Sequence, residues 1–202
     1  MSALISTNCP FILASASPRR RALLEQINMS FCVVVSPADE HIEGDPCPEE
    51  TVRQLAQQKV QPVAADHPSA LVLAADTVVA HEGTILEKPE TDDEAYRMLT
   101  RLSGTTHAVH TGFALSHLNS TRTVDAVETT TVSMGALSET EIEAYIRSGS
   151  PFDKAGGYGI QDHTAPLFID GIEGDYYTVV GLPLRRLYRL LHDTYPDLLT
   201  LT

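Results

Sequence analysis

The sequence predicts an α/β protein, because short apolar runs alternate along it with segments that carry the signals of helices. The runs over residues 11–14 and 71–80 are typical of buried strands. Two capping boxes, in which Ser or Thr is followed three residues later by Glu, open helices at Thr91 and Ser138. A chain of 202 residues has the length of one domain. We therefore expect residues 1–202 to form a single α/β domain.

The elements of the first half follow from helix signals and apolar spacing. After the strand over 11–14, Ser17 caps a helix whose first position is Pro18, a place that favours proline because its missing N–H has no partner there. The other elements expected here are a strand over 31–35, a polar loop over 36–50, a helix over 49–60 and the strand over 71–80.

In the second half, the capping box at Thr91 opens a helix that ends near Leu102, before Ser103 and Gly104. The segment 122–134 is rich in Thr and Val, which is typical of an exposed or edge strand. The other elements expected here are a strand over 109–115, a helix from 138 to about 149, strands over 167–169 and 177–180, and an amphipathic helix from 183 through 191.

Composition excludes several classes of protein. The 27 acidic and 14 Lys and Arg residues give a net charge of −13, which argues against nucleic acid or an anionic membrane as a partner. The three cysteines form no Cys-x-x-Cys pair, so a disulfide scaffold and a structural zinc site are not expected. Residues 1–10 lack the pattern of a secretory signal, and the longest apolar run, 70–75, is too short to cross a bilayer. We expect a cytoplasmic protein.

The first candidate site is the junction between the strand over 11–14 and the following helix. Backbone N–H groups and the helix dipole favour an anion there, and the guanidinium groups of Arg19 and Arg20 suit phosphate oxygens. The alternative is a solvated basic face. That alternative is weakened because cations at a helix N-terminus are unfavourable unless an anion compensates them. The pattern favours a phosphate site.

The second candidate is Asp76, which interrupts an apolar strand. Burying a carboxylate is costly unless it is paired or holds a cation, so a functional role is favoured over a loop or helix-cap aspartate. The acidic pair Asp39 and Glu40 is explained by solvation alone, although a divalent cation near a phosphate needs such oxygens.

The remaining candidates are weaker when each is taken singly. The three candidate lysines are Lys59, Lys88 and Lys154, and lysine side chains usually lie on the surface. The glycine-rich stretch 156–159 lacks a phosphate-loop pattern, so a turn is favoured. The eight histidines carry no metal-ligand motif, and we expect core or solvated roles for His107 and His110.

Taken together, these motifs resemble the Maf family of nucleoside triphosphate pyrophosphatases over about residues 12–191. The most specific of them is Leu-Ala-Ser-Ala-Ser-Pro-Arg-Arg at 13–20. It is followed by Asp39-Glu40, Lys59, Ala-Asp-Thr at 75–77, Leu-Glu-Lys-Pro at 86–89, Leu-Ser-Gly at 102–104, Asp-Lys-Ala-Gly at 153–156 and Val-Gly-Leu-Pro-Leu at 180–184. The family commonly has Glu before the lysine of the second helix, where this chain has Gln58.

The resemblance implies an elongated mixed β-sheet flanked by helices, with two lobes around a central cleft. It implies metal-assisted hydrolysis of a nucleoside triphosphate to the monophosphate and pyrophosphate. Asp76 matches the catalytic acid, and Glu40 and Asp76 would hold Mg²⁺ or Mn²⁺. The positions expected to bind substrate are Ser15, Arg19, Arg20, Lys59, Thr77, Lys88, Lys154 and Gln161.

Arg20, Thr77 and Gln161 match positions associated with base selection, and their identities are similar to the branch that prefers dTTP and UTP. Modified pyrimidine nucleotides are possible further substrates. A homodimer is compatible with the resemblance. It also keeps one alternative from another class, a non-catalytic nucleotide-binding regulator of septum formation and cell division. A second alternative is an enzyme of the inosine or xanthosine triphosphate type, against which the Ser-Pro-Arg-Arg opening argues.

Overall fold

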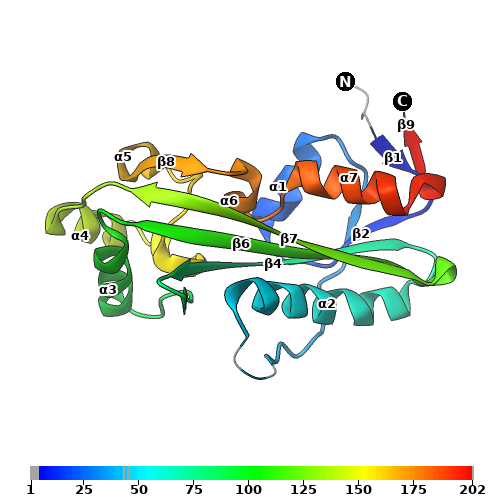
Figure 1. The fold of residues 1–202 in the computed structure, drawn as a ribbon, viewed down its shortest axis with the longest axis horizontal. Coiled ribbons are helices and arrows are strands. Elements are labelled where there is room, and N and C mark those ends of the chain that lie inside the picture. Colours follow the sequence, from blue (N-terminus) through cyan, green and yellow to red (C-terminus); the bar gives the residue numbers. More distant parts are fainter. Residues whose placement is uncertain (1–4, 43, 45, 202) are drawn as a thin grey trace. The chain divides into compact units, whose positions relative to one another are not determined.

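A computed structural model describes residues 5–42, 44 and 46–201 of the chain (Figure 1). The strands are β1 (Ile5–Thr7), β2 (Phe11–Leu13), β3 (Cys32–Val33), β4 (Leu71–His81), β5 (Thr84–Leu86), β6 (Thr106–His117), β7 (Arg122–Met134), β8 (Ile169–Glu173) and β9 (Leu199–Leu201). The α-helices are α1 (Pro18–Gln26), α2 (Pro48–Asp66), α3 (Asp92–Leu102), α4 (Glu139–Arg147), α5 (Ala165–Phe168), α6 (Tyr176–Val180) and α7 (Leu184–Thr194). Short 3₁₀ turns are η1 (Leu118–Ser120), η2 (Ser150–Asp153), η3 (Ala155–Gly157) and η4 (Pro196–Leu198).

The main sheet is mixed, which confirms the α/β prediction. Its strand order is β3-β2-β4-β6-β7-β8, and β5 pairs with β4 outside this path. Strand β2 pairs in parallel with β3 and β4, whereas β4 with β5 and β7 with β8 are antiparallel pairs. A second, small sheet joins β1 and β9 near the two ends of the chain.

The chain divides into two compact units. Unit 1 contains residues 1–76, 111–128 and 181–202, and unit 2 contains residues 77–110 and 129–180. Strands β4, β6 and β7 each contribute residues to both units. The division agrees with the two lobes that the family resemblance implies. The assignment of residues 1–202 to one domain stays a prediction.

The core of unit 1 forms where α2 packs on the strands. One buried cluster joins the inner face of α2 to side chains of β2, β4 and β6, namely Ile12, Ala14, Ala56, Val60, Val63, Ala64, Ala70, Val72, Ala74 and Ala114. Helix α2 lies on one side of these strands and α7 on the other (Figure 1). The fully buried Leu13 and Leu73 alternate along β2 and β4 with members of this cluster, so these strands are buried on both faces.

The core of unit 2 forms around α3 and α4. Both helices begin at the predicted caps, and the capping box of α4 is complete, with reciprocal bonds between Ser138 and Glu141. At α3, Thr91 accepts from the Glu94 N–H, whereas the Glu94 carboxylate accepts from the Glu90 N–H. The two helices contact each other, and their buried residues join side chains of β6 and β7 in one cluster, which includes Ala95, Leu99, Leu102, Val109, Val132, Ile142, Tyr145, Ile146 and Phe168.

Two predicted strands near the end of the chain are wrong. Residues 177–180 lie in helix α6, because the Asp175 carboxylate accepts hydrogen bonds from the Thr178 N–H at 2.8 Å and the Thr178 hydroxyl at 3.0 Å. That side-chain cap overrides the strand preference of a Thr-Val-Val run. Residues 167 and 168 lie in α5, a helical turn with Pro166 near its start, and the strand begins only at Ile169.

Other boundaries differ because of packing. Strand β7 is not an edge over residues 131–134, where it pairs with β8. Helix α2 continues past the expected end and past Pro62 to Asp66, since Val63 and Ala64 are buried in the unit 1 core. The strand expected over 31–35 is reduced to Cys32–Val33.

Residues 36–42, 44 and 46–47 of the predicted loop contain neither helix nor strand, and residues 43 and 45 lie outside the described part. The expectation of no secretory signal concerns residues 1–10, of which the first four also lie outside it. None of the helices in the described ranges is long and apolar enough to cross a membrane.

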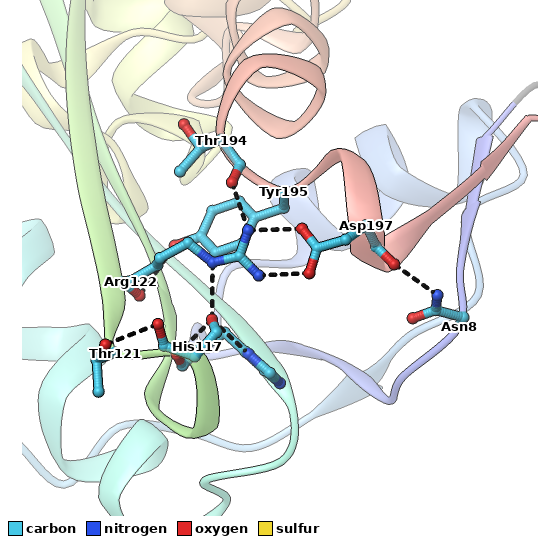
Figure 2. A network of polar contacts seen from close by, with 8 residues as sticks. Asn8, His117, Thr121, Arg122, Thr194, Tyr195 and Asp197 are labelled. Carbon is cyan, nitrogen blue, oxygen red and sulfur yellow. Dashed lines mark hydrogen bonds and ion pairs between the residues drawn. The ribbon is translucent and has the colours of Figure 1, made fainter.

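The end of the chain is held in unit 1 by a polar network around Arg122 (Figure 2). The Arg122 guanidinium donates to both carboxylate oxygens of Asp197, at 2.6 and 2.7 Å, and to the Thr194 carbonyl at 2.7 Å. The fully buried Tyr195 donates its hydroxyl to the Arg122 carbonyl at 3.0 Å and lies 3.1 Å from the Leu115 carbonyl. The network therefore ties α7 and η4 to β6 and β7.

We expect Tyr195→Phe to lower the free energy of unfolding by about 1 kcal/mol, because it removes a buried donor from two carbonyl oxygens. Urea denaturation monitored by circular dichroism measures this change. Asp197→Asn is the comparison: its side chain is 58% exposed, so we expect a smaller loss of stability than in Tyr195→Phe. Equal stability of Tyr195→Phe and wild type would contradict the anchoring role of the hydroxyl.

Candidate active site

The predicted anion site at the start of α1 has the expected local structure. Strand β2 ends at Leu13, and Ser17 caps α1 by accepting from the Arg20 N–H at 3.4 Å. The Arg20 side chain turns away from the helix: its Nε donates to the Gly181 carbonyl at 2.9 Å, and one terminal nitrogen lies 3.3 Å from the Ser15 hydroxyl. Arg20 is thus held between the first strand-to-helix junction and the segment that precedes α7.

The electrostatic surroundings of Arg20 include two predicted metal ligands. Burial lowers the pKa of the Arg20 guanidinium from its ordinary value, and the carboxylates of Asp76 and Glu40 oppose that shift. A guanidinium remains charged after such a shift. Arg20 is therefore a fixed positive charge whose field reaches these carboxylates, whereas Arg19, also half-buried, lies one residue earlier in α1.

Lys59 brings the predicted carboxylates of unit 1 together. Its ammonium lies 2.5 Å from Asp76 Oδ1 and 2.9 Å from Glu40 Oε2. The side chains of Lys59 and Asp76 are only 15% and 16% exposed, whereas that of Glu40 is 49% exposed. We call Glu40, Lys59 and Asp76 the carboxylate–lysine cluster. It explains how Asp76 tolerates partial burial, since a carboxylate inside a protein needs a cationic or hydrogen-bonding partner.

The sequence accounts for this placement. Residues 71–75 of β4 are buried, and burial loosens at Asp76 and Thr77, where unit 1 ends. Lys59 precedes the buried Val60 on α2, so the packing of the helix carries the lysine stem toward the strand. Glu40 reaches the same ammonium from the loop that precedes α2.

The described residues contain no group of three or more His, Cys, Asp or Glu side chains arranged to hold a metal ion. The carboxylate–lysine cluster offers two carboxylates, gathered around one cation. That donor set matches the way proteins bind Mg²⁺, with one or two carboxylates while water and substrate phosphates complete the shell.

In unit 2, the segments that carry Lys88 and Lys154 contact each other. The Gly156 N–H donates to the Glu87 carbonyl at 3.0 Å. Gly156 has a φ of +70°, and a Cβ there would lie 2.9 Å from Val79, so both conformation and space require glycine. The glycine-rich stretch is therefore a packed turn. Lys88 and Gln161 are exposed, and Thr77 is partly buried.

The ammonium of Lys154 is surrounded by oxygen atoms of the protein. It lies 2.6 Å from the Ser150 carbonyl, 2.6 Å from Asp153 Oδ1 and 3.5 Å from Asp162 Oδ2. Tyr145 donates its hydroxyl to the same oxygen of Asp162. An ammonium has three donors, and these acceptors can use all of them. Phosphate binding by Lys154 stays a prediction, and it would require an exchange of partners.

His107 is a core residue, as expected, and it supports the glycine-rich segment. Its Nε2 lies 2.6 Å from the Tyr158 hydroxyl, and the two rings meet edge to face at 5.2 Å. Its Nδ1 is buried and has no hydrogen-bond partner among the described residues. Burial, with a smaller contribution from His81, lowers the pKa of His107 to about 4. Burial also raises the pKa of Tyr158. Both side chains are therefore neutral at pH 7.

We expect His107 to make folding sensitive to acid. Its pKa falls from 6.5 to about 4 on folding, so the unfolded chain takes up the proton first as pH falls. The contribution of neutral His107 to the free energy of unfolding is present above about pH 6.5 and is lost as the pH falls toward 4. By pH 5 the loss is about 2 kcal/mol. Urea denaturation at pH 7 and pH 5 measures it. In His107→Phe, the difference in free energy of unfolding between pH 7 and pH 5 should be smaller by about 2 kcal/mol. The control is His67→Gln, at an exposed histidine, where this difference should equal that of wild type. An undiminished effect in His107→Phe would assign it to other groups.

The sequence did not single out Tyr145, Asp162 or the Gly181 carbonyl. The carbonyl is a backbone group, so its role in holding Arg20 leaves no signal in residue types. Tyr145 belongs to the apolar face of α4 and looks like an ordinary core residue. Asp162 follows Gln161 directly, and an acidic residue beside a proposed base-reading residue was the one available signal.

Comparison with known proteins places the chain in a family. The model of the Maf family, described as Maf-like protein, matches residues 10–194, and the chain belongs to this family. It is 62% identical to the dTTP/UTP pyrophosphatase of Salinibacter ruber, over 98% of both chains. It is 52% identical to the dTTP/UTP pyrophosphatase of Halalkalibacterium halodurans, over 90% of this chain and 94% of that one. A solved structure of the Staphylococcus aureus Ham1 protein is 13% identical with a TM-score of 0.45, covering 62% of this chain and 71% of that one.

Proposed function

We propose that this protein is a nucleoside triphosphate pyrophosphatase that hydrolyses dTTP and UTP to the monophosphate and pyrophosphate. The observation that carries the proposal is the carboxylate–lysine cluster, which interacts electrostatically with Arg20, in a chain 62% identical to a protein named dTTP/UTP pyrophosphatase. The cluster combines a partly buried carboxylate with the basic residues that a phosphate substrate needs.

The proposed cofactor is Mg²⁺ or Mn²⁺, and the residues of unit 1 fit it. Glu40 and Asp76 already direct oxygen atoms at one positive charge, that of the Lys59 ammonium. They would hold the metal, which supplies positive charge that stabilises the phosphate oxygens and the departing pyrophosphate.

The side chains themselves divide into two roles. Asp76 orients a water molecule and accepts its proton as the water oxygen attacks the α-phosphorus. The basic residues bind and orient the triphosphate, which carries about four negative charges. The residues proposed for this role are Arg19, Arg20, Lys59, Lys88 and Lys154, with the Ser15 hydroxyl beside Arg20.

Base selection is assigned to Arg20, Thr77 and Gln161. The hydroxyl of Thr77 and the amide of Gln161 each offer a donor and an acceptor, which suits the carbonyl and N–H groups on the edge of uracil or thymine. Adenine and cytosine present an amino group at the position of one of those carbonyls, so the same pattern would leave polar groups unpaired. Modified uracil nucleotides that keep this edge belong to the proposed substrate range.

A pyrophosphate-release assay tests the proposal. The protein is incubated with Mg²⁺ or Mn²⁺ and, separately, with dTTP, UTP, CTP, GTP, ATP, ITP and 7-methyl-GTP. We expect release from dTTP and UTP above all others. Release mainly from ITP or 7-methyl-GTP would retain the reaction and reject the base assignment. No release from any nucleotide would reject the enzyme. A homodimer and a cytoplasmic location stay predictions.

A further inference from the structure

Near Gln161, the side chain of Lys154 lies close against the backbone of Gly159. The Lys154 side chain crosses Gly159 so closely that a Cβ at this position would lie 2.5 Å from Lys154 Cε and 2.7 Å from Cδ. The same Cβ would lie 2.9 Å from Asp162 Oδ1. Glycine at 159 therefore lets the lysine reach the oxygen atoms that surround its ammonium.

Asp162 closes this arrangement through both its backbone and its side chain. Its N–H donates to the Gly159 carbonyl at 3.0 Å, which makes a turn with Ile160 and Gln161 at its centre. Its Oδ2 accepts the hydroxyl hydrogen of Tyr145 and faces the Lys154 ammonium at 3.5 Å. Gln161 thus lies in a turn whose last residue, Asp162, is held in place through its side chain.

The residue that anchors Asp162 from behind, Tyr145, is buried in the core. Tyr145 is 3% exposed, and its ring packs edge to face on Phe168 at 5.3 Å in the unit 2 core. Burial, followed by the contact with Asp162, raises the pKa of Tyr145, so its hydroxyl stays a hydrogen-bond donor. The Asp162 side chain is only 17% exposed, whereas that of Asp153, the other carboxylate on Lys154, is 62% exposed.

We propose that Asp162 is a positioning residue for base selection: anchored by Tyr145 and Lys154, it fixes the turn that presents Gln161 to the substrate base. This inference rests on the proposed function, in which Gln161 reads the base. It also gives Lys154 a second role, because its ammonium holds the turn in place through Asp162. This role either adds to phosphate binding or replaces it. The two roles of Lys154 predict different kinetics.

Three variants separate these roles. Asp162→Asn keeps an oxygen that can accept from Tyr145 but removes the charge that faces Lys154. Tyr145→Phe removes the hydroxyl and keeps the charge. Lys154→Met removes the ammonium and keeps much of the stem. Asp153→Asn is the matched control, since it removes a charge from the same lysine at an exposed position, where the amide oxygen still accepts.

The kinetic measurement compares kcat and KM for dTTP and CTP. In Asp162→Asn and Lys154→Met, we expect the preference for dTTP over CTP in kcat/KM to fall about tenfold, the loss of about one hydrogen bond. In Asp162→Asn, the KM for dTTP should rise while kcat stays within about threefold of wild type. In Lys154→Met, kcat should also fall, because this lysine belongs to the proposed phosphate-binding set. Tyr145→Phe should change in the same direction, and Asp153→Asn should match wild type. A uniform loss for both nucleotides, with the preference retained, would overturn the proposal and leave Lys154 as a phosphate ligand only.

A binding measurement separates this inference from the proposed function. Calorimetric titration with the monophosphates dTMP and CMP reports base preference without turnover. If wild type releases no pyrophosphate, the proposed function fails, while a dTMP preference that Asp162→Asn loses would still support the positioning role. An unchanged preference in a folded Asp162→Asn, with folding checked by thermal unfolding, rejects that role. If Asp162→Asn does not fold, Tyr145→Phe provides the same comparison.

Discussion

Asp76→Asn is expected to abolish pyrophosphate release from dTTP and UTP while the protein remains folded. An amide cannot accept the proton of the attacking water, and loss of a general base typically costs about 10²–10⁴-fold in rate. The variant keeps the shape of the side chain and an oxygen atom that can accept from Lys59. Glu40 still neutralises the Lys59 ammonium at 2.9 Å, so the carboxylate–lysine cluster keeps one of its two ion pairs.

The experiment measures kcat with dTTP and UTP, binding of dTTP by calorimetry, and the midpoint of thermal unfolding. Binding and the midpoint should stay close to wild type while kcat falls to background. Asp66→Asn, an exposed position at the end of α2, removes the same charge from the same unit and should keep full activity. Undiminished turnover in Asp76→Asn would reject its assignment as the catalytic base.

The parts of the fold that the sequence predicts well are those whose signals are local. Ser17 with Pro18, and the capping box at Ser138, mark helix starts because their side chains bond to backbone groups within the next turn. The apolar run that becomes β4 is recognisable because it is buried on both faces and needs no alternation. Such features are decided by neighbours in sequence.

The mistaken predictions concern residues whose structure depends on more distant or competing partners. Thr178 and Val180 favour a strand by type, but the Asp175 cap and burial in unit 2 place them in α6. Strand β7 looks exposed from its Thr residues, although the pairing of β8 is decided 40 residues later in the chain, as the register of Val132 with Ile172 shows. No local pattern contains that pairing.

The candidate site divides in the same way. Motifs pointed to Asp76, Lys59 and Glu40, and the structure brings these three together in unit 1. The motifs could not predict that Lys59 forms ion pairs with Glu40 and Asp76. The same lysine was expected to bind phosphate. Supporting contacts such as Asp162 with Tyr145 join residues 17 positions apart and became visible only in the structure.

Gly112→Ala is the substitution with the largest expected effect on stability. Gly112 lies in β6, and a Cβ there would be 2.5 Å from the Val52 carbonyl oxygen, 2.6 Å from its carbon and 3.0 Å from the Arg53 nitrogen. All three are backbone atoms of α2, so no side chain can turn aside and the helix itself must move. Forcing extra volume into a packed core typically costs about 1–3 kcal/mol, and a rigid backbone neighbour places this variant at about 3 kcal/mol.

The same displacement should reach the site, because α2 also carries Lys59. Lys59 lies seven residues, about two helical turns, beyond Val52, and its ammonium must stay within 2.5–2.9 Å of two carboxylates. A shift of about 1 Å in a positioning helix lowers turnover by up to about 10²-fold, so the folded fraction of Gly112→Ala should show a reduced kcat. Urea denaturation and dTTP assays on the same sample measure both effects. Gly171→Ala, where no atom apart from the glycine and its two chain neighbours lies within 4 Å of the new Cβ, should change neither. A Gly112→Ala protein with wild-type stability and kcat would contradict the expected displacement of α2 and Lys59.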